Sequence, residues 1–319
     1  MAAPPSGSLL TWATGSPIAP RWRRRDEQPL EMMRAPTNVL PGMAMANAMT
    51  IDVEDYFQVS ALAPYIARSQ WDTLDGRVEA NVERILAMLD EYGTHATFFT
   101  LGWIAERYPG LIRRIVANGH ELASHGFAHQ RATEQNPAAF FSDIQLAKIV
   151  LEDLTGVEVM GYRAPSFSIG QANSWAFECI ERAGYKYSSS VYPIKHDHYG
   201  MPDAPRFAHD VREGLLEVPV TTMRLFGRNW PAGGGGYFRL LPYATSRWLL
   251  RRVNHVDRQP AIFYFHPWEI DPAQPRVPGI DARTRFRHYL NLDRMERRLR
   301  KLLFDFEWGR VDEVMLEAA

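Results

Sequence analysis

Two histidines spaced four residues apart are the first feature of this chain that could do chemistry. His125 and His129 lie in the run Ser124-His125-Gly126-Phe127-Ala128-His129. Neutral imidazole is the commonest protein ligand for zinc and similar metals. If the run forms a helical turn, side chains at positions i and i+4 share one face and can reach one ion. Because this spacing also arises by chance, a metal site requires a carboxylate ligand and an acid or base nearby.

Three carboxylates within four residues are the next candidates. Asp52, Glu54 and Asp55 stand at the end of a short β-type run that begins at Ala48. Carboxylates crowded at a strand end repel one another unless a cation or solvent relieves them. The cluster is therefore either a cation site or a turn of exposed acids.

Alternating helix and strand patterns must position these residues. Apolar periodicity predicts helices over 78–92, 103–118, 137–154, 172–183, 242–256 and 283–304, and buried strands over 96–101, 120–125, 157–162, 185–192, 215–220 and 261–265. Such alternation indicates a parallel sheet covered by helices, and in a barrel of this kind the chemistry sits at the carboxyl ends of the strands. The acids, the histidine pair, Arg163 and His266 all follow predicted strands. We therefore expect these side chains to share one site.

Bulk composition excludes several other classes of function. The chain has 319 residues, a net charge of −1 and one cysteine, Cys179, so no intrachain disulfide can form. The near-neutral charge does not favour nucleic acid as a partner. No apolar run approaches the roughly 20 residues that span a bilayer, and the N-terminus lacks a signal-peptide pattern.

The chain divides into three predicted parts. Residues 1–47 are rich in Pro and Ala without periodicity, so they are expected to be disordered, or translated upstream of a true start near Met45 or Met49. Residues 48–270 are the expected catalytic domain, and 271–319 a helical extension packed on it.

The ordered motifs resemble the polysaccharide deacetylases of carbohydrate esterase family 4, the NodB-type homology domain. The resemblance covers about 50–268 and rests on four motifs in the family's order, Asp52-Val53-Glu54-Asp55, His125 to His129, Arg163-Ala164-Pro165 and Phe263-Tyr264-Phe265-His266. Finer motifs, including Gly-Gly-Gly-Tyr-Phe-Arg-Leu-Leu-Pro, are similar to deacetylases of bacterial exopolysaccharide loci of the exosortase type. The resemblance implies an α/β fold, a distorted, incomplete (β/α)7 barrel with a C-terminal extension.

The resemblance also implies roles for the candidate residues. A divalent metal, expected to be zinc, would be held by His125, His129 and one acid. Either Asp55 is that ligand and Glu54 the base, or Glu54 is the ligand and Asp52 the base. Strand alternation places Asp52 and Glu54 on one face and favours the second alignment, whereas the usual preference for aspartate as ligand favours the first.

The remaining implied roles concern proton transfer and the orientation of the catalytic groups. His266 would act as general acid, and Arg163 would hold the base by an ion pair. Ser188 stands where the subgroup tends to carry Asp, which leaves the orienting partner of His266 open.

The expected substrate is an acetylated polysaccharide or oligosaccharide from which N-acetyl, less often O-acetyl, groups are removed. Pro165, Phe167, Tyr192 and Trp268 are candidates to contact sugar rings, with a core position as the alternative for the three aromatic residues. Two other functions stay open, an amidohydrolase acting on a small cyclic amide and an inactive glycan-binding protein. The expected location is cytoplasmic, with contact to the membrane through a polysaccharide assembly machinery as the alternative.

Overall fold

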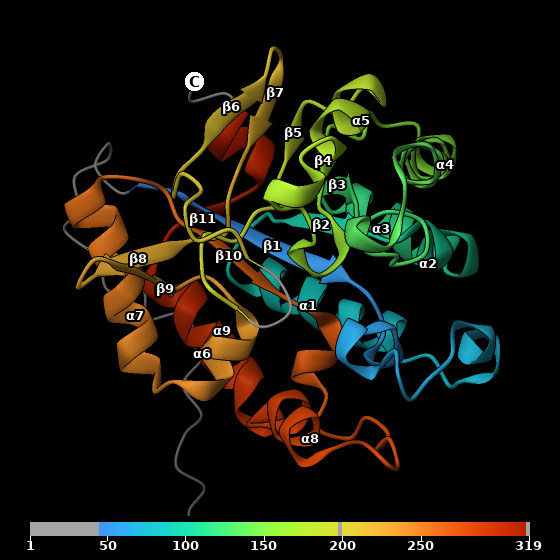
Figure 1. Ribbon diagram of the computed structural model, residues 1–319. Helices are drawn as coiled ribbons and strands as arrows, with labels where there is room; N and C mark the ends of the chain where they lie inside the picture. Colours follow the sequence, from blue (N-terminus) through green and yellow to red (C-terminus); the bar gives the residue numbers. More distant parts are fainter. Residues whose placement is uncertain (1–44, 197–199, 317–319) are drawn as a thin grey trace, which may run out of the picture. The chain divides into compact units, whose positions relative to one another are not determined.

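A curled, mostly parallel β-sheet forms the centre of the fold. The computed structural model describes residues 45–196 and 200–316. The parallel strands pair in the order β10 (Ile262–Phe265), β1 (Asn47–Val53), β2 (Thr97–Thr100), β3 (Glu121–Ser124), β4 (Gly161–Tyr162), β5 (Tyr187–Ser188) and β7 (Leu215–Glu217) (Figure 1). This confirms the expected α/β fold with an incomplete barrel. The predicted disordered segment falls mostly on residues 1–44, which lie outside the described residues.

The two edges of the parallel part of the sheet are paired differently. Strand β6 (His209–Arg212) adds to β7 in antiparallel register. At the other end, Gly233 O accepts a hydrogen bond from Tyr264 N at 2.7 Å, and Thr221 Oγ1 accepts one from Ile262 N at 2.6 Å. These bonds satisfy backbone donors of β10 that a fully open sheet edge would leave unpaired.

Helices on the first half of the chain follow the predicted alternation with one break. They are α1 (Val78–Glu91), α2 (Gly102–Arg107), α3 (Pro109–Ala117), α4 (Pro137–Thr155) and α5 (Ala176–Arg182). The predicted single helix over 103–118 is wrong, because Pro109 disfavours helical geometry at the residue before it and lacks the N–H that a continuous helix needs. By contrast, Asn136 caps α4 as expected, accepting a hydrogen bond from Ala139 N at 2.9 Å.

The C-terminal part of the chain joins the same sheet. It contains the hairpin β8 (Thr222–Leu225) and β9 (Arg228–Pro231), the helices α6 (Gly235–Leu240), α7 (Tyr243–Arg252), α8 (Ala282–Tyr289) and α9 (Leu292–Asp305), and the strand β11 (Trp308–Gly309). Strand β11 pairs parallel with β1. Met295, Leu299 and Leu302 of α9 belong to the main hydrophobic core, so burial of this apolar stripe fixes α9 against the barrel. Within 45–196 and 200–316, no helix is long and apolar enough to cross a bilayer.

Candidate metal-dependent active site

Glu54, His125 and His129 form the candidate metal centre. Glu54 directly follows β1 and His125 directly follows β3, so the parallel sheet delivers both to its carboxyl edge. One potential ligand atom from each of the three side chains lies within 4.8 Å of the others, and in the described part of the chain no other group of three His, Cys, Asp or Glu residues meets this condition. The histidine pair and the acidic cluster therefore do meet in space.

The histidine pair is brought together by a loop and not by the helical turn that the spacing suggested. No helix follows β3 before Ala132, and His129 has a φ of 55°. Gly126 has a φ of 75°, and a Cβ atom there would lie 2.8 Å from Asp143 Oδ2. The tight loop needs glycine at this point, and the left-handed backbone at His129 is the kind of strain that concentrates at functional sites.

The donor set fits a zinc-like divalent ion. His125 Nδ1 lies 2.8 Å from the carbonyl oxygen of Arg163, which fixes the proton on Nδ1 and leaves Nε2 as the ligand atom. Burial lowers the pKa of His125 to about 4, so the ring is neutral at pH 7. Glu54 Oε2 is buried and has no hydrogen-bond partner among the described residues, although it lies 2.7 Å from His129 Nε2. Two imidazoles and a carboxylate are a common ligand set of catalytic zinc.

The charge on Glu54 is also favourable for a cation. Burial raises the pKa of Glu54, but the charges of His129 and His266 outweigh this effect, and the pKa falls to about 2. The carboxylate is therefore ionised over the whole physiological range of pH.

Asp55, the other acid considered as a ligand, has a different environment. Its Oδ1 accepts a hydrogen bond from Tyr56 N at 2.8 Å, and its Oδ2 accepts from Arg77 N at 2.6 Å and from Val78 N at 2.9 Å. Burial raises its pKa to about 6. The first alignment, with Asp55 as the ligand, does not fit this geometry, because the carboxylate already caps the backbone at two places.

Asp52 is held by a buried arginine. Arg163, which follows β4, is fully buried and places Nη1 2.6 Å from Asp52 Oδ1. The same guanidinium donates to Thr50 Oγ1 at 2.8 Å and to Ser189 at both its carbonyl and hydroxyl oxygens. These contacts hold the guanidinium of Arg163 in one orientation, and its ion pair in turn orients Asp52.

His266 faces Asp52 and Glu54 from the end of β10. Its Nε2 lies 3.5 Å from Glu54 Oε1 and 3.9 Å from Asp52 Oδ2, and 20% of its side chain is exposed. Its Nδ1 lies 2.8 Å from Glu269 Oε1. Burial lowers the pKa of His266, but the charges of Glu54 and Glu269 more than offset this and raise it to about 9.

Glu269 is a residue of the candidate site to which the motifs assigned no role. The sequence feature that could have pointed to Glu269 is its position three residues after His266, in His266-Pro267-Trp268-Glu269. A short 3-10 turn over Pro267–Ile270 brings its carboxylate back to the ring. Ser188, which stands where the resemblance implied an acid in other members of the subgroup, donates to Ser190 Oγ at 2.8 Å.

The four candidate sugar-contacting residues are all buried. Trp268 donates from Nε1 to Glu54 Oε1 at 3.3 Å and stacks with His266 and His288. Phe167 and Tyr192 pack with Tyr264 in a small aromatic cluster, and Pro165 is also buried. The core alternative describes the three aromatic residues better than a stacking platform does.

Two family models match successive parts of the chain. The polysaccharide deacetylase family matches residues 67–188, and a domain of unknown function, DUF3473, matches residues 189–316. A peptidoglycan deacetylase of Helicobacter pylori is 30% identical over 165 residues, 48% of this chain and 54% of that protein. A peptidoglycan-N-acetylglucosamine deacetylase of Bacillus cereus is 29% identical over 112 residues, 35% of this chain and 51% of that protein. The chain thus spans about half the length of these two relatives.

A solved structure has the same fold. The crystal structure of a Mycobacterium smegmatis protein described as a polysaccharide deacetylase matches 86% of this chain and 90% of its own, with a TM-score of 0.53 and 19% sequence identity. At this identity the likeness concerns the fold alone. Residues 67–188 are thus similar to the polysaccharide deacetylase family, and the likeness of fold extends over most of the chain.

Proposed function

We propose that the protein removes N-acetyl groups from amino sugars of a polysaccharide or oligosaccharide in a metal-dependent hydrolysis. The observation that carries this proposal is the meeting of three ligand-type side chains with two proton-transfer groups. Glu54, His125 and His129 lie within ligand distance of one another, and His266 Nε2 lies within 4 Å of both Asp52 and Glu54.

Glu54, His125 and His129 are the residues that would hold the ion, which we propose to be zinc. Three protein ligands leave open positions at such a centre. When bound, a divalent metal there would supply polarisation of the acetyl carbonyl and a lowered pKa for water.

Asp52 is the proposed general base. Arg163 holds its carboxylate on the side of the strand that faces Glu54 and His266. Asp52 would accept the proton of the attacking water as the new C–O bond forms. The ion pair with Arg163 keeps the carboxylate oriented for this step.

His266 is the proposed general acid. With a pKa of about 9 its ring carries a proton on Nε2 at neutral pH. It would donate this proton to the amide nitrogen as the C–N bond breaks, which yields acetate and the free amine. Because His266 is the partly exposed member of an otherwise buried site, the acetyl group must enter beside it.

The substrate class rests on the relatives and the sequence motifs. The relatives named above are peptidoglycan deacetylases, and the finer motifs point to an exopolysaccharide or its precursor. Both substrates present N-acetyl groups on hexosamine rings, so we propose this shared chemistry as the target.

Acetate release tests the proposal directly. Purified protein should release acetate from N-acetylglucosamine oligomers or acetylated exopolysaccharide, lose activity on dialysis against a chelator and recover it with zinc. His125→Ala should abolish activity, whereas His255→Ala, which changes an exposed histidine away from the site, should not. Activity that survives chelation and His125→Ala would contradict the mechanism. Release of a ring-opened product from a small cyclic amide would favour the amidohydrolase, and glycan binding without turnover would favour a binding protein.

A further inference from the structure

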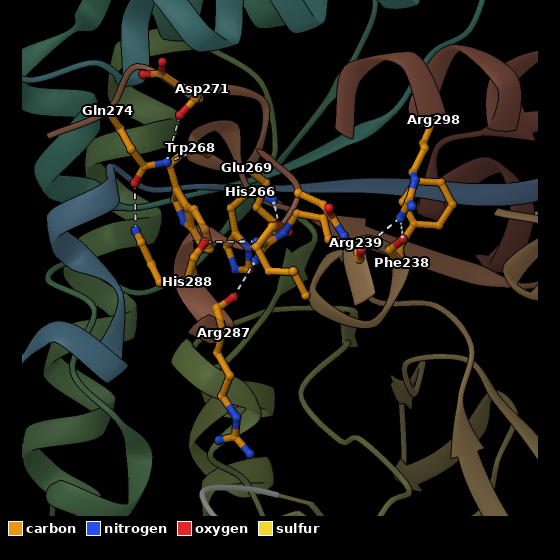
Figure 2. Close-up of polar contacts among 12 residues, drawn as sticks. Phe238, Arg239, His266, Trp268, Glu269, Asp271, Gln274, Arg287, His288 and Arg298 are labelled. Carbon is orange, nitrogen blue, oxygen red and sulfur yellow. Dashed lines mark hydrogen bonds and ion pairs between the residues drawn. The ribbon is translucent and has the colours of Figure 1, made fainter. Parts of the chain in front are cut away.

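A buried acid, Glu269, and a buried arginine, Arg239, lie behind His266. The proposed reaction does not use either of them directly. Glu269 Oε1 lies 2.8 Å from His266 Nδ1 and also accepts a hydrogen bond from His266 N at 3.1 Å (Figure 2). Glu269 Oε2 accepts from Arg239 Nε at 2.6 Å. Both oxygens of the carboxylate therefore face donors, and the side chain has one orientation available.

The glycine tract before α6 makes this arrangement possible. A Cβ atom on Gly235 would lie 2.3 Å from Glu269 Oε1 and 2.6 Å from Oε2, so any larger residue would displace the carboxylate. The next residue, Gly236, has open space around its Cβ position. Gly235 thus allows the first turn of α6 to lie against Glu269, and Arg239 reaches back to it from the same helix.

Arg239 is itself held by the C-terminal end of α8 and by the residue that follows this helix. Its Nη1 donates to the carbonyl oxygens of His288 at 3.0 Å and Leu290 at 2.7 Å, and its Nη2 donates to that of Arg287 at 3.2 Å. Figure 2 shows Arg239 and Glu269 beside His266, with Arg298 on the far side of Arg239. Arg298 in turn donates to the carbonyl oxygens of Phe238 and Arg239.

We propose that the DUF3473 part of the chain completes the deacetylase site, with Glu269 and Arg239 as positioning residues for His266. Glu269 holds a proton on Nδ1 and fixes the ring plane, so that Nε2 faces the substrate and the two acids at the end of β1. This inference rests on the proposed function. It assigns to the C-terminal domain the orienting acid that Ser188 does not provide, since the Ser188 hydroxyl binds Ser190.

The contacts predict what an isosteric change does. In Glu269→Gln, one carboxylate oxygen becomes an amide NH2, yet both oxygens face N–H donors. The amide oxygen will stay with the charged guanidinium of Arg239, because that hydrogen bond is the stronger one. The NH2 group then faces His266 Nδ1, which loses the acceptor that holds its proton in place.

The experiment compares two pairs of variants. Glu269→Gln is paired with Asp257→Asn, which changes a partly buried acid that binds Arg206 elsewhere in the same domain. Gly235→Ala is paired with Gly236→Ala. For each protein we would measure kcat and KM for acetate release, zinc content, the melting temperature, and the NMR signal of the Nδ1 proton of His266 in protein with isotope-labelled histidine.

Glu269→Gln and Gly235→Ala should lower kcat by roughly 10- to 100-fold with little change in KM or zinc content, in the range typical for loss of an orienting partner. The hydrogen-bonded Nδ1 proton signal should be lost in both, and Asp257→Asn and Gly236→Ala should match the parent protein. An unchanged kcat in folded Glu269→Gln, or a persistent Nδ1 proton signal, would overturn the inference.

The readouts also separate this inference from the proposed function. If the parent protein releases no acetate from any glycan, the proposed function fails, but the Nδ1 proton signal still reports whether Glu269 positions His266. If Glu269→Gln does not fold, the two glycine variants still test the role of Glu269, because both keep that residue. Gly235→Ala should displace its carboxylate and Gly236→Ala should not. Equal kcat values for these two variants would overturn the inference.

Discussion

Replacing Glu54 by Gln and Asp55 by Asn should separate metal binding from folding, although the two acids are neighbours in sequence. Glu54 lies with the two histidines, whereas the Asp55 carboxylate is occupied by three backbone N–H groups. We therefore expect Glu54→Gln to lose metal and Asp55→Asn to lose stability. This outcome would select the second of the two alignments that the sequence left open.

The hydrogen bonds of Asp55 set the size of the stability loss. An Asn side chain can turn its oxygen toward Arg77 N and Val78 N and keep both bonds. Its NH2 group then faces Tyr56 N, so one buried donor loses its acceptor, at a cost of about 1–3 kcal/mol. In a domain of this size that corresponds to a fall in the melting temperature of a few degrees, about 2–4 °C for each kcal/mol.

The expected loss of zinc affinity in Glu54→Gln follows from the number of proposed ligands. Gln in place of Glu54 removes the one negative charge among the three proposed ligands. Loss of an outer partner of a ligand already costs about 10- to 100-fold in metal affinity. Loss of the ligand itself should weaken zinc binding by at least about 100-fold on that scale.

Calorimetric titration of metal-free protein with zinc, and thermal unfolding of the same samples, measure both effects. Glu106→Gln, which changes an exposed acid, serves as the control and should alter neither quantity. The reasoning would be refuted by the reverse pattern, in which folded Asp55→Asn no longer binds zinc and Glu54→Gln binds it like the parent protein.

Three further predictions concern groups around the site. Arg163→Met should destabilise the protein by roughly 3–5 kcal/mol in urea titrations, because it leaves Asp52 buried without its cation, and it should abolish acetate release. Burial raises the pKa of Glu217 from 4.5 to about 7, so its neutral form is favoured in the folded protein. The stability that this group contributes is complete below pH 4.5 and is lost as the pH rises to about 7, a change of about 3 kcal/mol. Glu217→Gln should remove that part of the pH dependence, and identical unfolding curves against pH for parent and variant would contradict it. Gly126→Ala should weaken zinc binding, since its Cβ would meet Asp143, while Gly156→Ala, with a similar φ and open space, should cost stability without affecting zinc.

Much of the fold was predictable because local patterns and global topology agree. The alternation of apolar strands and amphipathic helices predicted the parallel sheet, and the rule that chemistry gathers at strand ends brought Glu54, His125, Arg163 and His266 together. These residues follow four different strands, and the sheet order makes those strands neighbours or near neighbours. Strand alternation also placed Asp52 and Glu54 correctly on the side that faces His266.

The errors arose where contacts between distant segments decide the geometry. The histidine spacing suits a helical turn, but the close approach of Asp143 to Gly126 and the backbone of His129 set a loop instead. The acid of Asp55 suits a ligand, but Arg77 and Val78, more than twenty residues away, supply the N–H groups that engage it. No local pattern contains this information.

The orienting acid of His266 illustrates how the two matched domains depend on each other. The proposed base and the proposed metal ligands come from residues 52–129, but His266, Glu269 and Arg239 lie within the DUF3473 match, 189–316. Strand β10 pairs directly with β1, so His266 reaches Glu54 and Asp52 only when the C-terminal domain is in place. His266, the proposed general acid, and its supporting residues therefore belong to the same part of the chain as the strand that completes the barrel. A truncation at the boundary between the two matched regions would remove the general acid together with the edge strand, and residues 45–188 alone should neither release acetate nor unfold cooperatively.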